Sequence, residues 1–600
     1  MGGTSGTFYR QFGLTLAIAI GFSAVNALTL SPALCAIFLK PHDEHTGKKM
    51  SFVDRFHTAF NAGYEATLSK YKKGVMFVIQ RRWLTFALVV LGAVVLVLLM
   101  RNTKTGLVPN EDTGTFMMNV TMQPGTSLEV TDATMDKIDS IIASNPHIMS
   151  RSKITGYGLI AGQGSSYGTF FCRLKDWSLR DVKGGDVNSV IGSMYMKTSV
   201  IQDARILIFA PPMIPGYSIS SGFELNLQDK TGGNLDQFFS IAQNFLMKLN
   251  QRPEVSFAQT TFNPTFPQYQ LDIDAAKCKR AGISPASILN IMQGYYGGIY
   301  ASNFNRFGKL YRVYIQADAQ YRISPETLQN IYVRNGMEMA PISEFVTLEK
   351  VYGPDNITRF NMFTSMLVNG AAADGYSSGD AIRAIQEVAA EELPTGYAYE
   401  FSGMTREEQQ SGDTTIIIFM LCLLFVYLLL SAQYESYILP LAVILSIPFG
   451  LAGTFIFAKM MGVQNDIYLQ IALIMLIGLL AKNAILIVEF ALERRKTGMG
   501  ISWAALLGAA ARLRPILMTS LAMVIGLLPL MFASGVGANG YRTLGSGAVG
   551  GMLIGMICQI FVVPALFVVF QYLQEKVEPL EWEDMDNSDL ETEIEQYAKS

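Results

Sequence analysis

The sequence predicts a membrane protein in which a bundle of transmembrane helices is interrupted by one large water-soluble block. Half of its 600 residues are apolar and only 16% are charged, whereas a soluble chain of this size carries about 25% charge. The apolar residues gather in long uncharged runs near both ends, while residues 102–412 have the composition of a soluble protein. The expected fold class is an all-α bundle of seven spans combined with an α+β soluble block.

A helix needs about 20 apolar residues to cross the hydrocarbon core of a bilayer. Seven apolar runs satisfy this length, two before the soluble block and five after it. They are residues 11–39, 83–100, 414–433, 436–458, 467–488, 515–541 and 543–574. The first run is longer than a cleavable signal peptide and lacks the basic start of one. The expected boundaries are a helix in 1–39, a cytoplasmic loop in 40–82, a helix in 83–101, the soluble block in 102–412, five helices in 413–574 and an acidic tail in 575–600.

Short loops rich in Lys and Arg mark the cytoplasmic side of a membrane protein. Residues 40–82 hold nine basic and four acidic residues, and residues 491–514 hold five basic and one acidic. Both are expected in the cytoplasm, which places the soluble block outside and the tail inside. A shared helical face of residues 40–82 predicts an amphipathic helix on the membrane surface, with a solvated linker as the alternative. The apolar members of this face are Phe52, Val53, Phe56, Phe60 and Tyr64.

The hydrophobic period of the soluble block alternates between two residues, typical of strands, and 3.6 residues, typical of helices. A strand, helix, strand order occurs three times in units of about 40 residues, which predicts ferredoxin-like subdomains. The expected elements are 114–122, 127–143 and 147–156, then 222–227, 234–249 and 255–262, and finally 359–367, 377–391 and 397–403. Residues 264–352 have a strand-rich pattern of their own, which predicts an inserted module.

Lys482 lies deep inside the apolar run GLLAKNAILIVEF. Inserting a lysine at this depth costs roughly 2.5–3.5 kcal/mol, so its ammonium group needs a partner, usually an acidic one. No Asp or Glu lies centrally in the other runs, and Glu489 is about 10 Å along the same helix, near the membrane surface. The acidic partner is therefore expected from outside this sequence. The alternative is a lysine held only by backbone carbonyls and Asn483.

Arg512 and Thr519 are spaced by seven residues in ARLRPILMTSLAMVIGLLPL. This spacing places both on one face of a helix that is expected to enter the membrane at Pro515. A threonine hydroxyl inside the membrane can orient a proton or bond back to a carbonyl of its own helix. The spacing alone favours the second interpretation.

Residues 156–168 (GYGLIAGQGSSYG) form a glycine-rich segment between two expected strands. They lack the lysine and the helix start of a phosphate-binding loop, so they are interpreted as a mobile loop that carries Tyr157 and Leu159. The nearby apolar candidates for lining a cavity are Phe170, Phe171, Phe209 and Met213. Each of them alone is more often a core residue.

Several classes of function are disfavoured by the composition. The net charge of −3 argues against a nucleic-acid-binding surface. No HExxH motif and no nucleophile elbow occurs, so neither an enzyme nor a cofactor is expected. His42 and His45 form too small a set for a metal site. Cys172 and Cys278 are the two cysteines of the soluble block, and a disulfide between them is left open beside two free thiols.

Four long motifs carry a resemblance to a known family. They are FYRQFGLTLAIAIGFSAVNALTLSPALCAIFLKP, GLLAKNAILIVEFA, RLRPILMTSLAMVIGLLPL and RLKDW. Nearly the whole chain resembles the C-terminal half of a resistance-nodulation-cell division (RND) transporter, within the hydrophobe/amphiphile efflux (AcrB-like) branch. The resemblance implies a proton-driven exporter of the bacterial inner membrane, with its large domain in the periplasm.

The resemblance also implies roles for individual residues. The proton relay of the family falls on Lys482, Asn483, Arg512 and Thr519, which favours the proton-orienting role of the threonine. The substrate-binding and gate-loop positions fall on Gly156, Tyr157, Gly158, Leu159, Gly162, Gly164, Phe171, Phe209 and Met213. Leu159 stands where the family has Phe, which leaves the range of exported compounds open. Residues 264–352 would belong to the docking region.

The expected function is the C-terminal half of a multidrug efflux transporter, the inner-membrane component of a tripartite pump. The implied partners are an N-terminal half with paired intramembrane aspartates, a periplasmic adaptor, an outer-membrane channel, membrane lipids and further copies in a homotrimer. One alternative is an RND-type metal-ion exporter, because the chain has 30 Met, although these are spread through apolar runs. A second alternative is a non-transporting scaffold or receptor, which would have no reason to bury Lys482.

Overall fold

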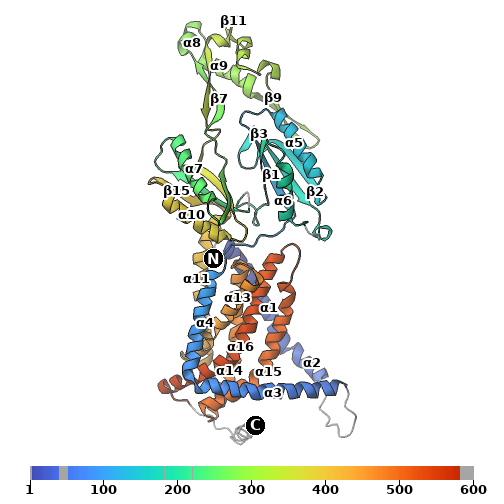
Figure 1. Cartoon of the computed structure of the whole chain (residues 1–600), viewed down its shortest axis with the longest axis vertical. Coiled ribbons are helices and arrows are strands. Elements are labelled where there is room, and N and C mark those ends of the chain that lie inside the picture. Colours follow the sequence, from blue (N-terminus) through green and yellow to red (C-terminus); the bar gives the residue numbers. More distant parts are fainter. Residues whose placement is uncertain (1–2, 39–51, 181–183, 219–220, 581–600) are drawn as a thin grey trace.

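The computed structural model describes residues 3–38, 52–180, 184–218 and 221–580. A helical bundle forms one end of an elongated molecule, two sheet-containing subdomains stand on it, and a smaller module forms the far tip (Figure 1). His42, His45 and the end of the acidic tail lie outside the described residues. The structure therefore separates an apolar bundle from a soluble block, as the composition predicts.

The bundle contains α1 (Gly3–Leu28), α2 (Leu30–Phe38), α4 (Arg82–Asn102), α11 (Gly403–Tyr434), α12 (Pro440–Ile444), α13 (Ile447–Met461), α14 (Ile467–Lys496), α15 (Ile501–Met531) and α16 (Ala538–Val577). Within the described residues, seven helical segments are long and apolar enough to cross a membrane, with α1 and α2 counted as one and α12 and α13 as another. They coincide with the seven apolar runs of the sequence. The last two runs are separated at residues 532–537, close to the turn composition of residues 535–540.

Helix α15 begins at Ile501, well before Pro515, so the entry of this helix into the membrane at Pro515 stays a prediction. Residues 501–511 (ISWAALLGAAA) are mostly strong helix formers, and Ala504, Ala505 and Ala509 are buried in the bundle. Pro515 is therefore an internal residue of α15, and such prolines are tolerated in membrane helices. The basic segment 491–514 is mainly helical.

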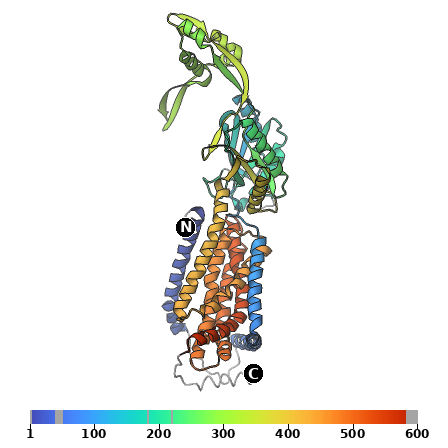
Figure 2. The ribbon, with the colours of Figure 1, turned by 90° about the vertical axis from the view of Figure 1, so that its left-hand side faces the viewer.

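Close approach of helix backbones holds α16 in the middle of the bundle. A Cβ atom at Gly550 would lie 2.8 Å from the carbonyl oxygen of Gly453, and a Cβ at Gly453 would lie 2.7 Å from that of Gly550. Small residues allow this contact between α13 and α16, which is typical of helices that pack inside membranes. By contrast, α1 contributes mainly exposed apolar side chains and lies at the edge of the bundle (Figure 2).

Helix α3 (Phe52–Gln80) crosses the end of the bundle that faces away from the soluble block (Figure 1). Tyr71, Val75 and Ile79 are buried against the bundle, and the Tyr71 hydroxyl donates a hydrogen bond to the Ile560 carbonyl at 2.8 Å. Phe60 is exposed. The predicted helix is therefore present and packs across the end of the bundle, and its place on the membrane surface stays a prediction.

The first subdomain has the strand order β2-β3-β1-β4, and all its strand pairs are antiparallel. Its elements follow in the chain as β1 (Thr115–Met122), α5 (Leu128–Ala143), β2 (Ile148–Gly158), β3 (Gly162–Leu174), α6 (Val187–Thr198) and β4 (Ala204–Phe209). The predicted strand, helix and strand of the first unit are thus present. The βαββαβ order is that of a ferredoxin-like unit.

The second and third predicted units share one sheet instead of forming separate ones. Its strands are β5 (Phe223–Asp229), β6 (Val255–Thr260), β13 (Thr358–Phe360), β14 (Phe363–Ala372) and β15 (Tyr397–Phe401), covered by α7 (Leu235–Asn250) and α10 (Ser378–Glu392). The central strand β14 pairs with β5, β6 and β13. The predicted strand 359–367 is divided, because Asn361 and Met362 adopt φ values of 50° and 71° and turn the chain into a hairpin.

The inserted module contains β7 (Phe266–Ile273), α8 (Ala275–Ala281), α9 (Pro285–Met292), β8 (Ile299–Arg306), β9 (Lys309–Ile315), β10 (Tyr332–Asn335), β11 (Glu338–Pro341) and β12 (Val346–Gly353). Strands β7 and β12 pair along their whole length and connect the module to the second subdomain. The module has its own core around Cys278, Ile288 and Val333.

The disulfide between Cys172 and Cys278 is absent, since both are free, buried thiols. Cys172 belongs to the core of the first subdomain, whereas Cys278 belongs to the core of the inserted module. Burial raises the pKa of the Cys172 thiol to about 12. Both cysteines therefore pack as small apolar residues.

Candidate functional site

Lys482 lies in the middle of α14 with an exposed side chain, while the next residue, Asn483, is buried. In the part of the chain that the structure describes, Lys482 takes part in none of the ion pairs. Glu489 is exposed farther along the same helix. The expected acidic partner is thus not provided by the described residues.

A buried hydrogen bond joins α14 to α15 beside Lys482. The Asn483 side-chain amide donates to the Ser520 hydroxyl at 3.0 Å. Lys482 precedes Asn483 and Thr519 precedes Ser520, so this bond brings the two exposed side chains of Lys482 and Thr519 to the same level of the helix pair. Ser520 is not among the predicted site residues, although its place beside Thr519 in the segment MTSL was an available signal.

Thr519 and Arg512 are placed differently from one another. The Thr519 hydroxyl donates to the Pro515 carbonyl at 3.0 Å, which is the bond to its own helix that the spacing favours. The Arg512 guanidinium carbon lies 3.4 Å from the centre of the Phe490 ring, a stacked cation–π contact. Its Nε is buried and has no hydrogen-bond partner among the described residues. Arg512 therefore contacts α14 rather than Thr519.

Residues 156–168 do not form the loop that their sequence suggests, because most of them belong to the β2–β3 hairpin. Tyr157 pairs with Gln163 and Gly158 with Gly162, so that only residues 159–161 form the turn. Gly156 and Gly162 have φ values of 85° and 84°, and the register shifts beside Gly156. Glycine is required at these two positions because L side chains rarely adopt such values.

Side-chain hydrogen bonds attach this hairpin to the rest of the first subdomain. The Leu159 amide donates to Asn119 Oδ1 at 2.9 Å, and the Thr169 hydroxyl donates to the Tyr157 carbonyl at 2.7 Å. Gly164 faces the Tyr167 ring closely, since a Cβ there would lie 2.8 Å from it. The turn is therefore supported from the neighbouring strand β1.

Two predicted aromatic positions flank Met117 on the sheet face opposite the helices. Met117 of β1 pairs with Phe171 of β3 on one side and with Phe209 of β4 on the other. Phe170 points to the other face and belongs to the core. Three apolar side chains thus form a row on the face that carries no helix of this subdomain.

Met213 lies apart from this row and lines a cavity of about 550 Å³ between the soluble subdomains and the bundle. Its sulfur accepts a hydrogen bond from the Glu111 amide at 3.1 Å. Glu408 and Asp466 also line this cavity. Neither carboxylate was predicted as a site residue, because Glu408 and Asp466 lie just outside the apolar runs 414–433 and 467–488.

Asp466 caps the first turn of α14, since its Oδ1 accepts a hydrogen bond from the Leu469 amide at 2.9 Å. Its Oδ2 is buried without a hydrogen-bond partner among the described residues. Burial raises the pKa of Asp466 to about 7. Glu408 Oε1 accepts a hydrogen bond from the Ser378 hydroxyl at 2.7 Å. The position of Asp466 directly before an apolar run is a helix-start signal that a sequence search can use.

A metal centre finds no support in the described ranges, where no group of three His, Cys, Asp or Glu side chains is placed to hold an ion. The described residues thus combine a bundle of helices that are long and apolar enough to cross a membrane with a block of two sheet subdomains. The chain belongs to the AcrB/AcrD/AcrF family, which it matches over residues 1–571.

Several efflux transporters are similar to this chain. The multidrug/solvent efflux pump membrane transporter MepB of Pseudomonas putida is 36% identical over 586 residues, which are 96% of this chain and 55% of the relative. The multidrug export protein AcrF of Escherichia coli K12 is 36% identical over 577 residues, covering 95% and 55%. The multidrug resistance protein MdtF of the same organism is 33% identical over 583 residues, covering 96% and 55%. The chain therefore spans about half the length of the curated relatives that it matches.

Proposed function

We propose that the chain is the C-terminal half of a proton-driven exporter of hydrophobic and amphiphilic compounds. The single observation that carries this proposal is Lys482, a mid-membrane cation on α14 that takes part in no ion pair within the described residues. An unpaired lysine is costly in a membrane, so a partner with an intramembrane acidic group is the simplest completion. Membership of an efflux family and the half-length match to its multidrug transporters support the same function.

In this proposal, Lys482, Asn483, Arg512 and Thr519 belong to the proton relay. An ion pair that forms and breaks at Lys482 strongly changes the free energy of the position that α14 occupies, because charges interact strongly in a medium of low dielectric constant. The hydrogen bond between Asn483 and Ser520 passes a displacement of α14 to α15. Thr519 joins the relay only when its hydroxyl leaves the Pro515 carbonyl.

The substrate region of the proposal is the open face of the first subdomain. Phe171, Phe209 and Met117 provide an apolar row for an amphiphilic compound, and the β2–β3 hairpin with Tyr157 and Leu159 borders it. The glycines Gly156, Gly158, Gly162 and Gly164 belong to this gate segment, and Met213 lies nearer the bundle.

The proposed assembly is a homotrimer of complete pumps in the bacterial inner membrane. The soluble block, including the inserted module, lies in the periplasm and contacts a periplasmic adaptor and an outer-membrane channel. The paired intramembrane aspartates are expected from the N-terminal half. The 30 methionines favour metal-ion export only weakly, since methionine also fills gaps between apolar helices.

Co-expression with an N-terminal half that carries the paired aspartates tests this proposal. We expect dye efflux that depends on the proton gradient and that neither half shows separately. A matched pair with the aspartates replaced by asparagine is the control. Efflux of equal rate with this control would contradict the proton-driven mechanism, and absence of efflux from the intact pair would favour the scaffold alternative.

A further inference from the structure

The linker between α4 and β1, residues 103–114, is bonded along its length to both the bundle and the soluble block. It leaves α4, passes the starts of α14 and α16, and enters the central strand pair of the first subdomain. Residues 107–110 line the cavity between the two regions. This segment can be either a flexible tether or a rigid connection between the bundle and the first subdomain, and its hydrogen bonds distinguish the two.

The first part of the linker is held by the start of α14. The Asn465 amide donates to the Lys104 carbonyl at 2.7 Å, and the Ile467 amide donates to the Leu107 carbonyl at 3.1 Å. Thr105 forms a parallel bridge with Asn465. The Thr105 carbonyl also accepts a hydrogen bond from the Gly379 amide at the start of α10. This part therefore connects α14, which carries Lys482, to the second subdomain.

The next part of the linker is held by the first turn of α16. The Asn539 side-chain amide donates to the Asn110 carbonyl at 2.7 Å. The Gly540 amide donates to Glu111 Oε1, also at 2.7 Å. A carboxylate at a helix N-terminus satisfies a free amide and interacts favourably with the helix dipole. Glu111 thus serves as a cap for α16 from a distant part of the chain.

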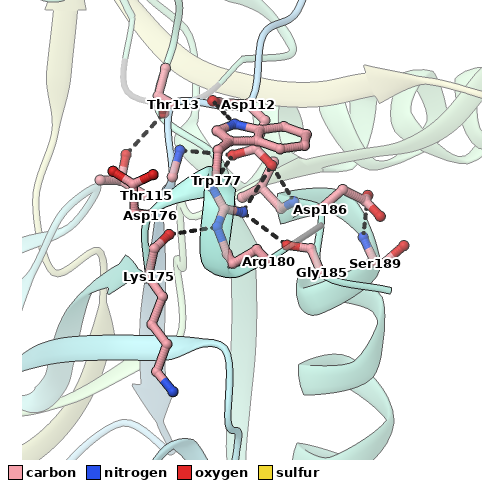
Figure 3. A network of polar contacts seen from close by, with 12 residues as sticks. Asp112, Thr113, Thr115, Lys175, Asp176, Trp177, Arg180, Gly185, Asp186 and Ser189 are labelled. Carbon is pink, nitrogen blue, oxygen red and sulfur yellow. Dashed lines mark hydrogen bonds and ion pairs between the residues drawn. The ribbon is translucent and has the colours of Figure 1, made fainter. Parts of the chain in front are cut away.

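The following residue, Asp112, is bonded in the same way to the first subdomain (Figure 3). Its Oδ2 accepts hydrogen bonds from the Val187 amide at the start of α6, at 2.8 Å, and from Arg180 at 3.1 Å. The side chain of Arg180 is 1% exposed. Arg180 also donates to Asp112 Oδ1 at 3.3 Å and to the Lys175 and Gly185 carbonyls. Trp177 completes the group, since its indole N–H donates to the Asp112 carbonyl at 3.3 Å.

Two adjacent carboxylates therefore cap two helices that belong to different regions, α16 in the bundle and α6 in the first subdomain. Both bonds are charge-assisted, and the Asp112–Arg180 pair is buried, so separating its partners is strongly unfavourable. A flexible tether would leave these backbone and side-chain groups to water. The bonds instead hold residues 104–107 and residues 110–112 of the linker.

We propose that Glu111 and Asp112 are positioning residues of a rigid connection that transmits displacements of α14 and α16 to the sheet of the first subdomain. A shift of the α16 start moves Glu111, and the peptide bond to Asp112 carries the motion to α6 and Arg180. The same sheet carries Phe171 and Phe209. The transport consequence of this inference rests on the proposed function, whereas the mechanical connection does not.

Trp177 provides a test that requires no transport. Replacing Trp83, Trp503 and Trp582 by Phe leaves Trp177 as the sole tryptophan of the full chain. Asn539→Ala then removes one bond on the α16 side, and Arg542→Ala is the matched control, since Arg542 bonds to the Ala533 carbonyl. We expect Asn539→Ala, and not Arg542→Ala, to shift Trp177 emission to the red and to increase its quenching by acrylamide. Unchanged emission and quenching in Asn539→Ala would overturn the connection.

A second measurement tests the consequence for transport in the completed pump. Glu111→Ala should lower efflux about tenfold at unchanged membrane abundance, as expected for loss of a charged hydrogen bond. Glu111→Gln keeps an acceptor oxygen and should restore most of the efflux, and Glu129→Ala on the exposed surface of α5 is the control. Wild-type efflux in Glu111→Ala would overturn the coupling role. If the wild-type pair shows no efflux, the proposed function fails and the fluorescence of Trp177 alone decides the mechanical connection.

Discussion

Lys482 and Asn483 show how neighbouring residues of one helix divide two roles. Asn483 holds α14 against α15 through Ser520, whereas Lys482 keeps its charge on an open face of the helix. The packing of α14 therefore does not depend on the ammonium group. A change of the lysine alone is expected to affect function and to spare the fold.

We expect Lys482→Ala to abolish efflux by the complemented pump without lowering its membrane abundance. The reason is that insertion becomes easier when a charge is removed from mid-membrane, while the ion pair of the relay is lost. Dye efflux and immunoblots of membrane fractions measure the two quantities. Lys459→Ala, at the end of α13, is the control. Normal efflux in Lys482→Ala would show that Lys482 has no role in the proton relay.

Asp466 should make stability dependent on pH. Burial raises its pKa from 3.8 to about 7, so the folded protein binds this proton more tightly than the unfolded protein. The contribution of the group to stability is therefore lost as the pH rises through about 7. Asp466→Asn should reduce the decrease in Tm between about pH 5 and about pH 8. The exposed Asp236→Asn is the control, and an unaltered decrease in Asp466→Asn would refute this assignment.

Cys172 and Cys278 should behave as inert thiols. Both are buried and so shielded from reagents, and burial raises the pKa of Cys172 to about 12, so the reactive thiolate of Cys172 is scarce. We expect neither residue to react with maleimide until the protein is denatured. Mass spectrometry of peptides from the unreduced protein should show no link between them, and detection of that link would show that the two cores rearrange.

At the scale of the elements, the β2–β3 hairpin depends on one side chain of the neighbouring strand. Asn119→Ala removes the acceptor of the Leu159 amide, a loss of about 1–3 kcal/mol for a buried group. Hydrogen exchange at Leu159 should become faster, while Thr113→Ala, in the preceding linker, should leave it unchanged. Equal exchange in both variants would mean that the strand ladder alone holds the turn.

The contact between α13 and α16 should tolerate no added methyl group. Gly550→Ala places a Cβ 2.4 Å from that of Phe457 and 2.8 Å from the Gly453 carbonyl, and overpacking costs about 1–3 kcal/mol. The Tm in detergent should fall. Gly526 on α15 has open space around it, so Gly526→Ala should be neutral or slightly stabilising. A similar Tm for both variants would contradict the close approach.

Local periodicity predicts most individual elements, because it reports which side of a helix or strand is buried. Eight of the nine strands and helices expected in the three units occur within about two residues of their predicted bounds, and the ninth, 359–367, is divided between β13 and β14. Periodicity does not report which strands pair, and the joining of β5, β6, β14 and β15 in one sheet depends on residues far apart in the chain. The glycine-rich sequence of the hairpin suggested a mobile loop. Two of its glycines instead have the positive φ values that a bulge and a tight turn require.

The candidate site was predictable only where composition is unusual. Lys482 is recognisable because a charge inside an apolar run is costly, and the resemblance to a family supplies its neighbours. Ser520 and Asn119 act through hydrogen bonds across elements, and neither residue type is unusual in its surroundings. Asp112 and Arg180 are 68 positions apart, and no local pattern connects them.

For the whole molecule, the orientation in the membrane is a prediction that rests on the basic loops. Met337 in the inserted module is fully exposed, and Gly500 lies between α14 and α15 at the opposite end. In intact spheroplasts of a variant without Cys35, we expect a membrane-impermeant maleimide to label Met337→Cys. Gly500→Cys should be labelled only after permeabilisation. The reverse pattern would place the soluble block in the cytoplasm.

The pairing of β7 with β12 allows the inserted module to be exchanged during evolution. Phe266 at the start of β7 is opposite Gly353 at the end of β12, so the chain departs from the second subdomain and returns to it through neighbouring points. A segment with adjacent ends can be exchanged for another of different length without moving the strands that flank it. The tip of the molecule is thus free to change its contacts in evolution at a different rate from the sheets and helices below it. Chimaeras joined at these two residues would keep the parent subdomain intact and transfer the contacts of the donor.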